Sequence, residues 1–292
     1  MLGKLIKHEW KNTWRAGCLF LVSLAAITSL GWLAFQSPMW RGVAEYEYMY
    51  SHPVPMAILD IASVFTLLLY VLMLAAASLG ILICIVLQFY RTMYSGEGYL
   101  THTLPVTKNQ LLVSKILVGG VWLLIVALGI ILSAVGLFSF MVASTVHEYS
   151  VGEFWRLVFK EVGEIFRMME VELDLELGAR MVFGIAGLVI SPFLSLITIF
   201  GAISLGQLFT RHRVLMAIVC YIGVQMAGGL LQTVLEVIFA PAAYRGIEFD
   251  LGRNILGYVD ANSLISYGVE VLLAVGMYLA SYLVTTKKLN LE

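Results

Sequence analysis

The chain has 292 residues, of which 60% are hydrophobic and 13% are charged, and its formal net charge is −1 at pH 7. Its mean hydropathy is +0.91. This composition excludes an ordinary water-soluble domain, in which charged residues make up about a quarter of the chain. We therefore expect an integral membrane protein.

Six apolar runs approach or exceed the roughly 20 residues that a helix needs to cross a hydrocarbon core about 30 Å thick. The runs lack the alternating pattern of β-barrel strands, and a helix satisfies its own backbone hydrogen bonds in lipid. The sequence therefore predicts an all-α integral membrane protein. Its six transmembrane helices are expected at residues 16–37, 58–89, 111–145, 179–208, 214–240 and 263–286.

The first span is preceded by a basic stretch, residues 1–15. Apolar residues recur in it at helical spacing, namely Leu2, Leu5, Ile6, Trp10 and Trp14. Basic residues occupy the other faces, namely Lys4, Lys7, Lys11 and Arg15. This pattern predicts an amphipathic helix on the membrane surface, with Trp10, Trp14 and Arg15 at the interface. The alternative is a basic segment that only sets the topology. The apolar run behind it is too long for a signal-peptide core, so we expect the first span to be retained.

A polar segment, residues 90–110, separates the second and third spans. Gly96 and Gly98 interrupt it, and Pro105 ends any helix that begins there. Its apolar residues are Tyr94, Tyr99, Leu100 and Leu104. An apolar side on an exposed loop suggests a partner protein. We predict a short helix across the membrane plane, the alternative being a loop that lies back on the lipid headgroups.

The loop at 146–178 has the periodicity of an amphipathic helix. Its apolar positions are Val151, Phe154, Trp155, Val158, Val162, Ile165, Phe166 and Met169. Acidic residues fall between them, namely Glu153, Glu161, Glu164 and Glu170. This helix could cap an exit path, contact a second subunit or rest on the outer leaflet, and we favour the packed cap. Binding of a cationic peptide is a further alternative.

Lysine and arginine residues set the predicted orientation. With a cytoplasmic N-terminus, eleven of the 18 would lie in inside segments and seven in outside segments. Most acidic residues would then fall in the outer loops at 146–178 and 241–262. Both termini are therefore predicted to be cytoplasmic.

Few strongly polar residues lie in or beside the later spans. Glu236 lies near the outer end of the fifth span and Glu270 early in the sixth. Together with Gln225 and Gln232 they are candidates for contact with a substrate or a proton, because a carboxylate in a membrane is a functional candidate by default. Hydrogen bonding between helices is the alternative. Three pairs of small residues, Ala76 with Gly80, Ala202 with Gly206 and Gly223 with Ala227, predict close helix contacts.

Several catalytic motifs are missing from the sequence. It has no Gly-x-x-x-x-Gly-Lys-Ser/Thr phosphate loop, no His-Glu-x-x-His zinc helix and no Gly-x-Ser-x-Gly turn. Its three cysteines, Cys18, Cys84 and Cys220, lack the spacing of a metal site. We therefore expect no catalytic residue and no metal in this chain, and we do not expect it to be an ATPase.

The stretch GEGYLTHTLPVTKNQLLVSK, between the second and third of six spans and behind an amphipathic N-terminal helix, resembles the permease subunits of type-2 ABC exporters from Gram-positive bacteria. The resemblance implies that this loop carries a coupling helix held in a cleft of a partner ATPase, which the N-terminal helix also touches. The matching positions are Glu97, Gly98, Tyr99, Leu100, Leu104 and Pro105, and Lys115 corresponds to the basic residue that opens the third helix.

The same resemblance implies a permease that exports an amphipathic peptide, antibiotic or lipid-like molecule across the cell membrane. Its partners would be an ABC ATPase subunit in two copies, a second identical or related permease, and lipid, with no nucleic acid. This chain would bind no cofactor, since ATP and Mg would sit on the ATPase. The long acidic loop at 146–178 departs from the short connection of many family members, so the substrate does not carry over.

Two other functions stay open. An ion-gradient-driven secondary transporter or channel would use Glu236 or Glu270 as its coupling carboxylate. A membrane sensor or scaffold subunit would bind a ligand through its external loop without transporting it.

Overall fold

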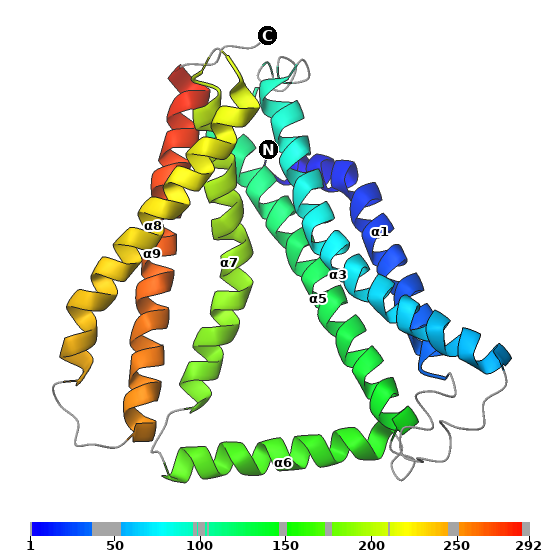
Figure 1. Ribbon diagram of the computed structural model, residues 1–292. Helices are drawn as coiled ribbons and strands as arrows, with labels where there is room; N and C mark the ends of the chain where they lie inside the picture. The colour runs from blue at the N-terminus through cyan, green and yellow to red at the C-terminus, as the bar shows by residue number, and fades with distance from the viewer. Residues whose placement is uncertain are drawn as a thin grey trace. The chain divides into compact units, whose positions relative to one another are not determined.

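The computed structural model describes residues 2–36, 54–95, 98, 103, 105–145, 151–172, 177–209, 211–244 and 251–287. Within these ranges the chain forms seven long helices and no strand (Figure 1). The helices are α1 (Leu2–Ala34), α3 (Val54–Tyr94), α5 (Lys108–Thr145), α6 (Val151–Glu172), α7 (Leu177–Gly206), α8 (Arg213–Tyr244) and α9 (Leu251–Lys287).

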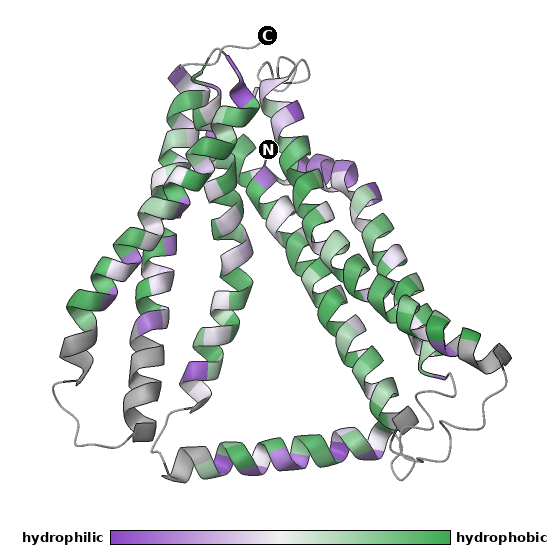
Figure 2. Cartoon of the chain, in the orientation of Figure 1, coloured by the Kyte–Doolittle hydropathy of each residue, from purple (hydrophilic) through white to green (hydrophobic). Residues whose placement is uncertain are grey.

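Six of the helices, all except α6, are long and apolar enough to cross a membrane. Hydrophobic residues run along their length, whereas hydrophilic and hydrophobic residues alternate along α6 (Figure 2). For the described residues, the prediction of an all-helical chain with six helices long and apolar enough to cross a membrane is therefore confirmed.

Five of the six spanning helices are longer than the predicted spans, and α7 has the predicted length of 30 residues. Residues 2–34 form one helix that includes the predicted surface stretch from Leu2 onward and the predicted first span as far as Ala34. Helix α3 has 41 residues, a length of about 60 Å at 1.5 Å per residue, twice the thickness of the hydrocarbon core. Helix α9 begins at Leu251, inside the predicted external loop at 241–262. Apolar run length identifies a span well, but a helix can continue past the point where the run ends.

The chain divides into two compact units. The first unit comprises Met1–Trp10, Ile85–Val121 and Met169–Glu292. In it α7, α8 and α9 pack side by side (Figure 1). The packing is close, because a Cβ atom added to Gly201 of α7 would lie 2.7 Å from the carbonyl oxygen of Met277 in α9.

The turn between α7 and α8 is tight. A Cβ atom on Gly206 would lie 2.7 Å from the backbone nitrogen of Ala217. His212 adopts a positive φ of 58°, a conformation that residues other than glycine rarely take. Its carbonyl oxygen accepts a hydrogen bond from the Met216 N–H at 2.9 Å, which starts α8. This turn holds the first part of α8 against α7.

The second unit comprises Lys11–Cys84 and Trp122–Met168. It contains most of α1, the first part of α3 and the second part of α5. The ring of Trp122 lies over Gly17, where an added Cβ atom would come within 2.2 Å of it. Phe35, Tyr70 and Leu137 form a buried cluster that joins the three segments.

Helix α6 lies within the loop that was expected to carry an amphipathic helix. Its first turns pack on the end of α5, where Phe154 contacts Phe138 and the Trp155 Nε1–H donates to Ser139 Oγ at 2.7 Å. Further along, Phe159 is 70% exposed and Ile165 49% exposed. Within the described residues, the contacts of α6 are concentrated at its beginning.

Candidate functional site

The predicted coupling segment is described only in part. Glu97, Tyr99, Leu100 and Leu104 lie outside the described residues. Gly98 is buried, and its N–H donates to the Ser95 carbonyl oxygen at 2.7 Å. Pro105 is exposed. What the structure does define is the two ends from which this segment extends, the end of α3 and the start of α5.

A buried ion pair lies near these ends. Lys115 Nζ of α5 is 2.5 Å from Glu9 Oε1 of α1, and the two side chains are only 4% and 9% exposed. Lys115 also donates to Thr92 Oγ1 of α3 at 2.7 Å. Gln88 Nε2 donates to the other Glu9 oxygen at 3.1 Å. We call Glu9, Gln88, Thr92 and Lys115 the charged cluster. It links the N-terminal helix, the end of α3 and the start of α5.

Burial makes this pair sensitive to change. A buried charge is tolerated when it is paired and hydrogen-bonded, and removal of one partner leaves the other without compensation. Both carboxylate oxygens of Glu9 and two donors of Lys115 are engaged. Such fixed geometry favours one register of α1 against α3 and α5.

A second set of buried polar side chains fixes the end of α3 to α7 and α9. The Tyr94 hydroxyl donates to Ser204 Oγ of α7 at 2.6 Å, and Ser204 Oγ is 2.8 Å from Ser281 Oγ of α9. The exposed fractions of the three side chains are 5% or less. We call Tyr94, Ser204 and Ser281 the hydroxyl chain.

Aromatic stacking supports the hydroxyl chain. The Phe89 ring of α3 lies parallel to the Phe200 ring of α7, with centroids 3.8 Å apart, and meets the Tyr94 ring edge-on at 6.0 Å. Both phenylalanines are 1% exposed. The end of α3 is thus held by packing as well as by hydrogen bonds.

The start of α5 is fixed in a similar way. Thr107 caps it, since its Oγ1 accepts the Gln110 N–H at 3.3 Å. The Tyr278 hydroxyl of α9 donates to Asn109 Oδ1. Both ends of the polar segment are therefore attached to other helices of the same compact unit.

The four polar candidates of the later spans are not gathered into one site. Gln232 Nε2 donates to Glu236 Oε1 at 2.8 Å, and Gln225 Nε2 donates to the Tyr221 hydroxyl at 2.9 Å. Each pair lies one turn apart on α8. Glu270 is half-buried on α9, and no hydrogen bond joins it to the other three among the described residues.

The interfacial candidates of α1 differ in exposure. Trp10 is half-buried and Arg15 is exposed. Trp14 is 51% exposed, and its ring meets Trp122 edge-on with centroids 6.1 Å apart.

No three histidine, cysteine, aspartate or glutamate side chains lie close enough to hold a metal ion within the part of the chain that the structure describes. The charged cluster and the hydroxyl chain join helices through hydrogen bonds and one ion pair.

Sequence reasoning did not single out Glu9 or the hydroxyl chain as site residues. The sequence did contain a signal for Glu9, because it is the one acidic residue before Glu45. It also lies at helical spacing from Leu5, Ile6 and Thr13, which occupy the less exposed face of α1. An acidic residue on the inward face of a basic helix indicates a buried cation. No comparable signal marks Ser204 or Ser281, because serines are common in membrane helices.

Among the described residues, these observations are those of a multi-pass helical membrane protein in which buried polar contacts hold the end of α3 and the start of α5 to other helices. Comparisons with protein-family models, curated proteins and solved structures found no match to this chain.

Proposed function

We propose that this chain is the membrane-spanning permease subunit of an ATP-driven exporter. In this proposal it lies in the cell membrane with both termini in the cytoplasm. It pairs with a second identical or related permease and with two copies of a separate ABC ATPase. The cargo is an amphipathic molecule such as a peptide, for example an antimicrobial peptide, an antibiotic or a lipid-like compound.

The observation that carries the proposal is the attachment of both ends of the polar segment. The charged cluster and the Tyr278–Asn109 contact hold the start of α5, and the hydroxyl chain holds the end of α3. A partner that displaces this segment would therefore move α1, α7 and α9 together with α3 and α5. Stiff connections of this kind transmit a push, whereas a freely hinged loop would absorb it.

Within the proposal, each group of residues has a role. Glu97, Gly98, Tyr99, Leu100, Leu104 and Pro105 contact the ATPase. Trp10, Trp14 and Arg15 hold the N-terminal helix at the membrane surface beside it. ATP and Mg are bound by the ATPase, and closure of its two copies drives the displacement.

The test is co-purification from the native membrane. We expect a tagged chain, extracted in mild detergent, to carry an ATP-hydrolysing partner in near-equal amount. Glu97→Ala with Leu104→Ala should lower the ratio of partner to tagged chain by about tenfold, which corresponds to about 1.4 kcal/mol of binding free energy. ATP hydrolysis in the eluate and stained-gel band ratios provide the measurement.

The matched control is Leu157→Ala with Glu164→Ala, which removes the same two residue types from exposed positions on α6. It should keep the partner. A wild-type preparation without any ATPase contradicts the proposal. In that case pH-dependent transport that is lost in Glu270→Gln would favour the ion-gradient alternative.

A further inference from the structure

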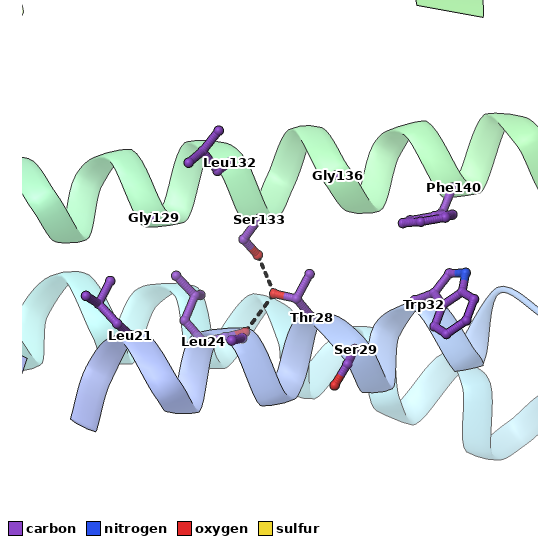
Figure 3. A pocket seen from close by; sticks show the side chains of 11 residues that line it. Leu21, Leu24, Thr28, Ser29, Trp32, Gly129, Leu132, Ser133, Gly136 and Phe140 are labelled. Atoms are coloured by element: carbon purple, nitrogen blue, oxygen red, sulfur yellow. Dashed lines mark hydrogen bonds between the residues drawn. The ribbon is translucent and has the colours of Figure 1, made fainter. Parts of the chain in front are cut away.

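A groove runs between the second halves of α1 and α5, inside the second compact unit (Figure 3). Its volume is about 530 Å³, within the range of ligand-binding pockets. Leu21 and Gly129 line one end, and Trp32 and Phe140 line the other. Gly129 comes 108 residues after Leu21, and Phe140 comes 108 residues after Trp32. The two helices therefore run in the same direction along the groove.

Small residues on α5 create the space. Gly129, Ser133 and Gly136 recur on one face, and a Cβ atom added to Gly136 would have no neighbouring heavy atom within 4 Å. The two helices are in contact at two places along the groove. A Cβ atom added to Gly31 would come within 2.9 Å of Leu137, and one added to Gly129 would come within 3.0 Å of Leu21. The groove is therefore held open between two contact points.

The hydroxyl groups of the groove are already bonded to the protein. The Thr28 hydroxyl donates to the Leu24 carbonyl oxygen at 2.6 Å and lies 2.6 Å from Ser133 Oγ (Figure 3). Ser133 Oγ also lies 2.8 Å from the Tyr70 hydroxyl, and Ser29 donates to the Ala26 carbonyl oxygen at 2.7 Å. A ligand in the groove therefore meets hydrocarbon and aromatic surface, which suits an apolar occupant.

The groove has the length of one leaflet. From Leu21 to Trp32 the helix rises about 16 Å, which is close to half of a hydrocarbon core about 30 Å thick. The Trp32 and Phe140 rings, with centroids 5.5 Å apart, border its far end. One residue before Phe140, Ser139 binds Trp155 of the amphipathic helix α6. Aromatic side chains and amphipathic helices are both typical of the membrane–water interface.

The groove is also continuous with the lipid-facing surface of the two spans. Val22 of α1 is 69% exposed, and Leu132, which lines the groove on α5, is 71% exposed. In a membrane these side chains contact acyl chains. The groove deepens that same surface where it passes between α1 and α5.

We propose that this groove is a binding site for one acyl chain of a phospholipid, with the headgroup beside Trp32 and Phe140. The lipid belongs to the leaflet on the side where α1 and α5 end, which the charge pattern predicts to be the outer one. The site does not depend on the proposed export function or on an ATPase partner. The competing occupant is a helix of a second copy of the chain.

The experiment uses the full chain in nanodiscs of phosphatidylcholine, a fraction of which carries a photoactivatable diazirine on the acyl chain. Peptide mass spectrometry locates the label after irradiation. We expect label on residues 129–140 of the wild type. Gly136→Phe fills the groove and should lower that label by about tenfold.

Gly223→Phe is the matched control, because Gly223 of α8 also has no heavy atom within 4 Å of an added Cβ atom. It should leave the label on residues 129–140 unchanged. If Gly136→Phe does not yield folded protein, Gly136→Leu replaces it, with the same expected direction.

Two outcomes would overturn the proposal. Equal label on residues 129–140 in wild type and in the filled variant would mean that the lipid contacts only the outer surface. Protein–protein cross-links from a photoreactive residue at position 136, in place of lipid label, would assign the groove to a second copy.

Discussion

The contacts inside the first compact unit differ in kind from the contacts inside the second. In the first unit, a buried ion pair and a chain of hydroxyl groups connect α1, α3, α5, α7 and α9. In the second, most of the described contacts are between aromatic and aliphatic side chains. The hydroxyl groups of Thr28, Tyr70 and Ser133 form a small hydrogen-bonded cluster among them. Polar bonds define one register, whereas apolar packing in lipid depends on shape alone, because lipid is as apolar as the side chains.

Helices α1, α3 and α5 each contribute long stretches to both units. Residues of α1, α3 and α5 take part in the charged cluster or the hydroxyl chain on one stretch and in apolar packing on another. The difference between the units can be tested by substitutions of decreasing effect.

The largest effect is expected for Lys115→Met. This change leaves the Glu9 carboxylate buried at 9% exposure without its cation and should lower the free energy of unfolding by about 3–5 kcal/mol. The double variant Glu9→Leu with Lys115→Met should regain most of that loss, since an apolar pair can replace a buried ion pair. Denaturation in detergent micelles by sodium dodecyl sulfate gives the measurement.

The control for this variant is Lys160→Met. Lys160 lies 3.8 Å from Glu164 on α6, with both side chains more than half exposed, so its loss should change the free energy of unfolding by less than about 1 kcal/mol. Similar losses for Lys115→Met and Lys160→Met would show that the charged cluster does not stabilise the first unit.

Gly201→Val should have an intermediate effect. The new Cβ atom would lie 2.6 Å from the Met277 Cβ and 2.7 Å from its carbonyl oxygen, so α7 and α9 must separate. Overpacking of this kind costs about 1–3 kcal/mol. Gly276→Val on α9 adds the same side chain where no heavy atom lies within 4 Å of the new Cβ and should be close to neutral. Equal effects would contradict the close approach of α7 and α9.

The smallest effect is expected for loss of one hydroxyl group. Tyr94→Phe removes the bond to Ser204, which keeps Ser281 as a partner, so the loss should be about 1 kcal/mol. Tyr70→Phe in the second unit should cost a similar amount, because Ser133 keeps Thr28. Tyr282→Phe, at a 38% exposed position, is the control. A neutral Tyr94→Phe would show that stacking on Phe89 and Phe200, rather than hydrogen bonding, holds the end of α3.

The spans could be predicted from the sequence because each one depends only on local composition. A run such as 111–145 is apolar enough to be assigned alone, and α5 occupies Lys108–Thr145. Helix α6 could be predicted for a similar reason, since the spacing of Phe154, Val158 and Val162 requires no knowledge of the rest of the chain.

Contacts between helices could not be predicted in the same way. Glu9 and Lys115 are 106 residues apart, and periodicity tells which face a residue occupies but not which helix lies opposite. The small-residue pairs show this limit. Gly206 does approach another helix, at Ala217, whereas an added Cβ atom on Gly223 would have no described neighbour within 4 Å.

The separation of Glu9 from Lys115 also bears on how the protein is made. At a synthesis rate of about 5–20 residues per second, Lys115 follows Glu9 from the ribosome by about 5–20 seconds. Until the third span arrives, the N-terminal residues have no buried cation to hold them and must keep the Glu9 charge in water. A chain arrested after its second span would therefore expose a free N-terminal segment, which quality-control proteases could distinguish from the finished protein.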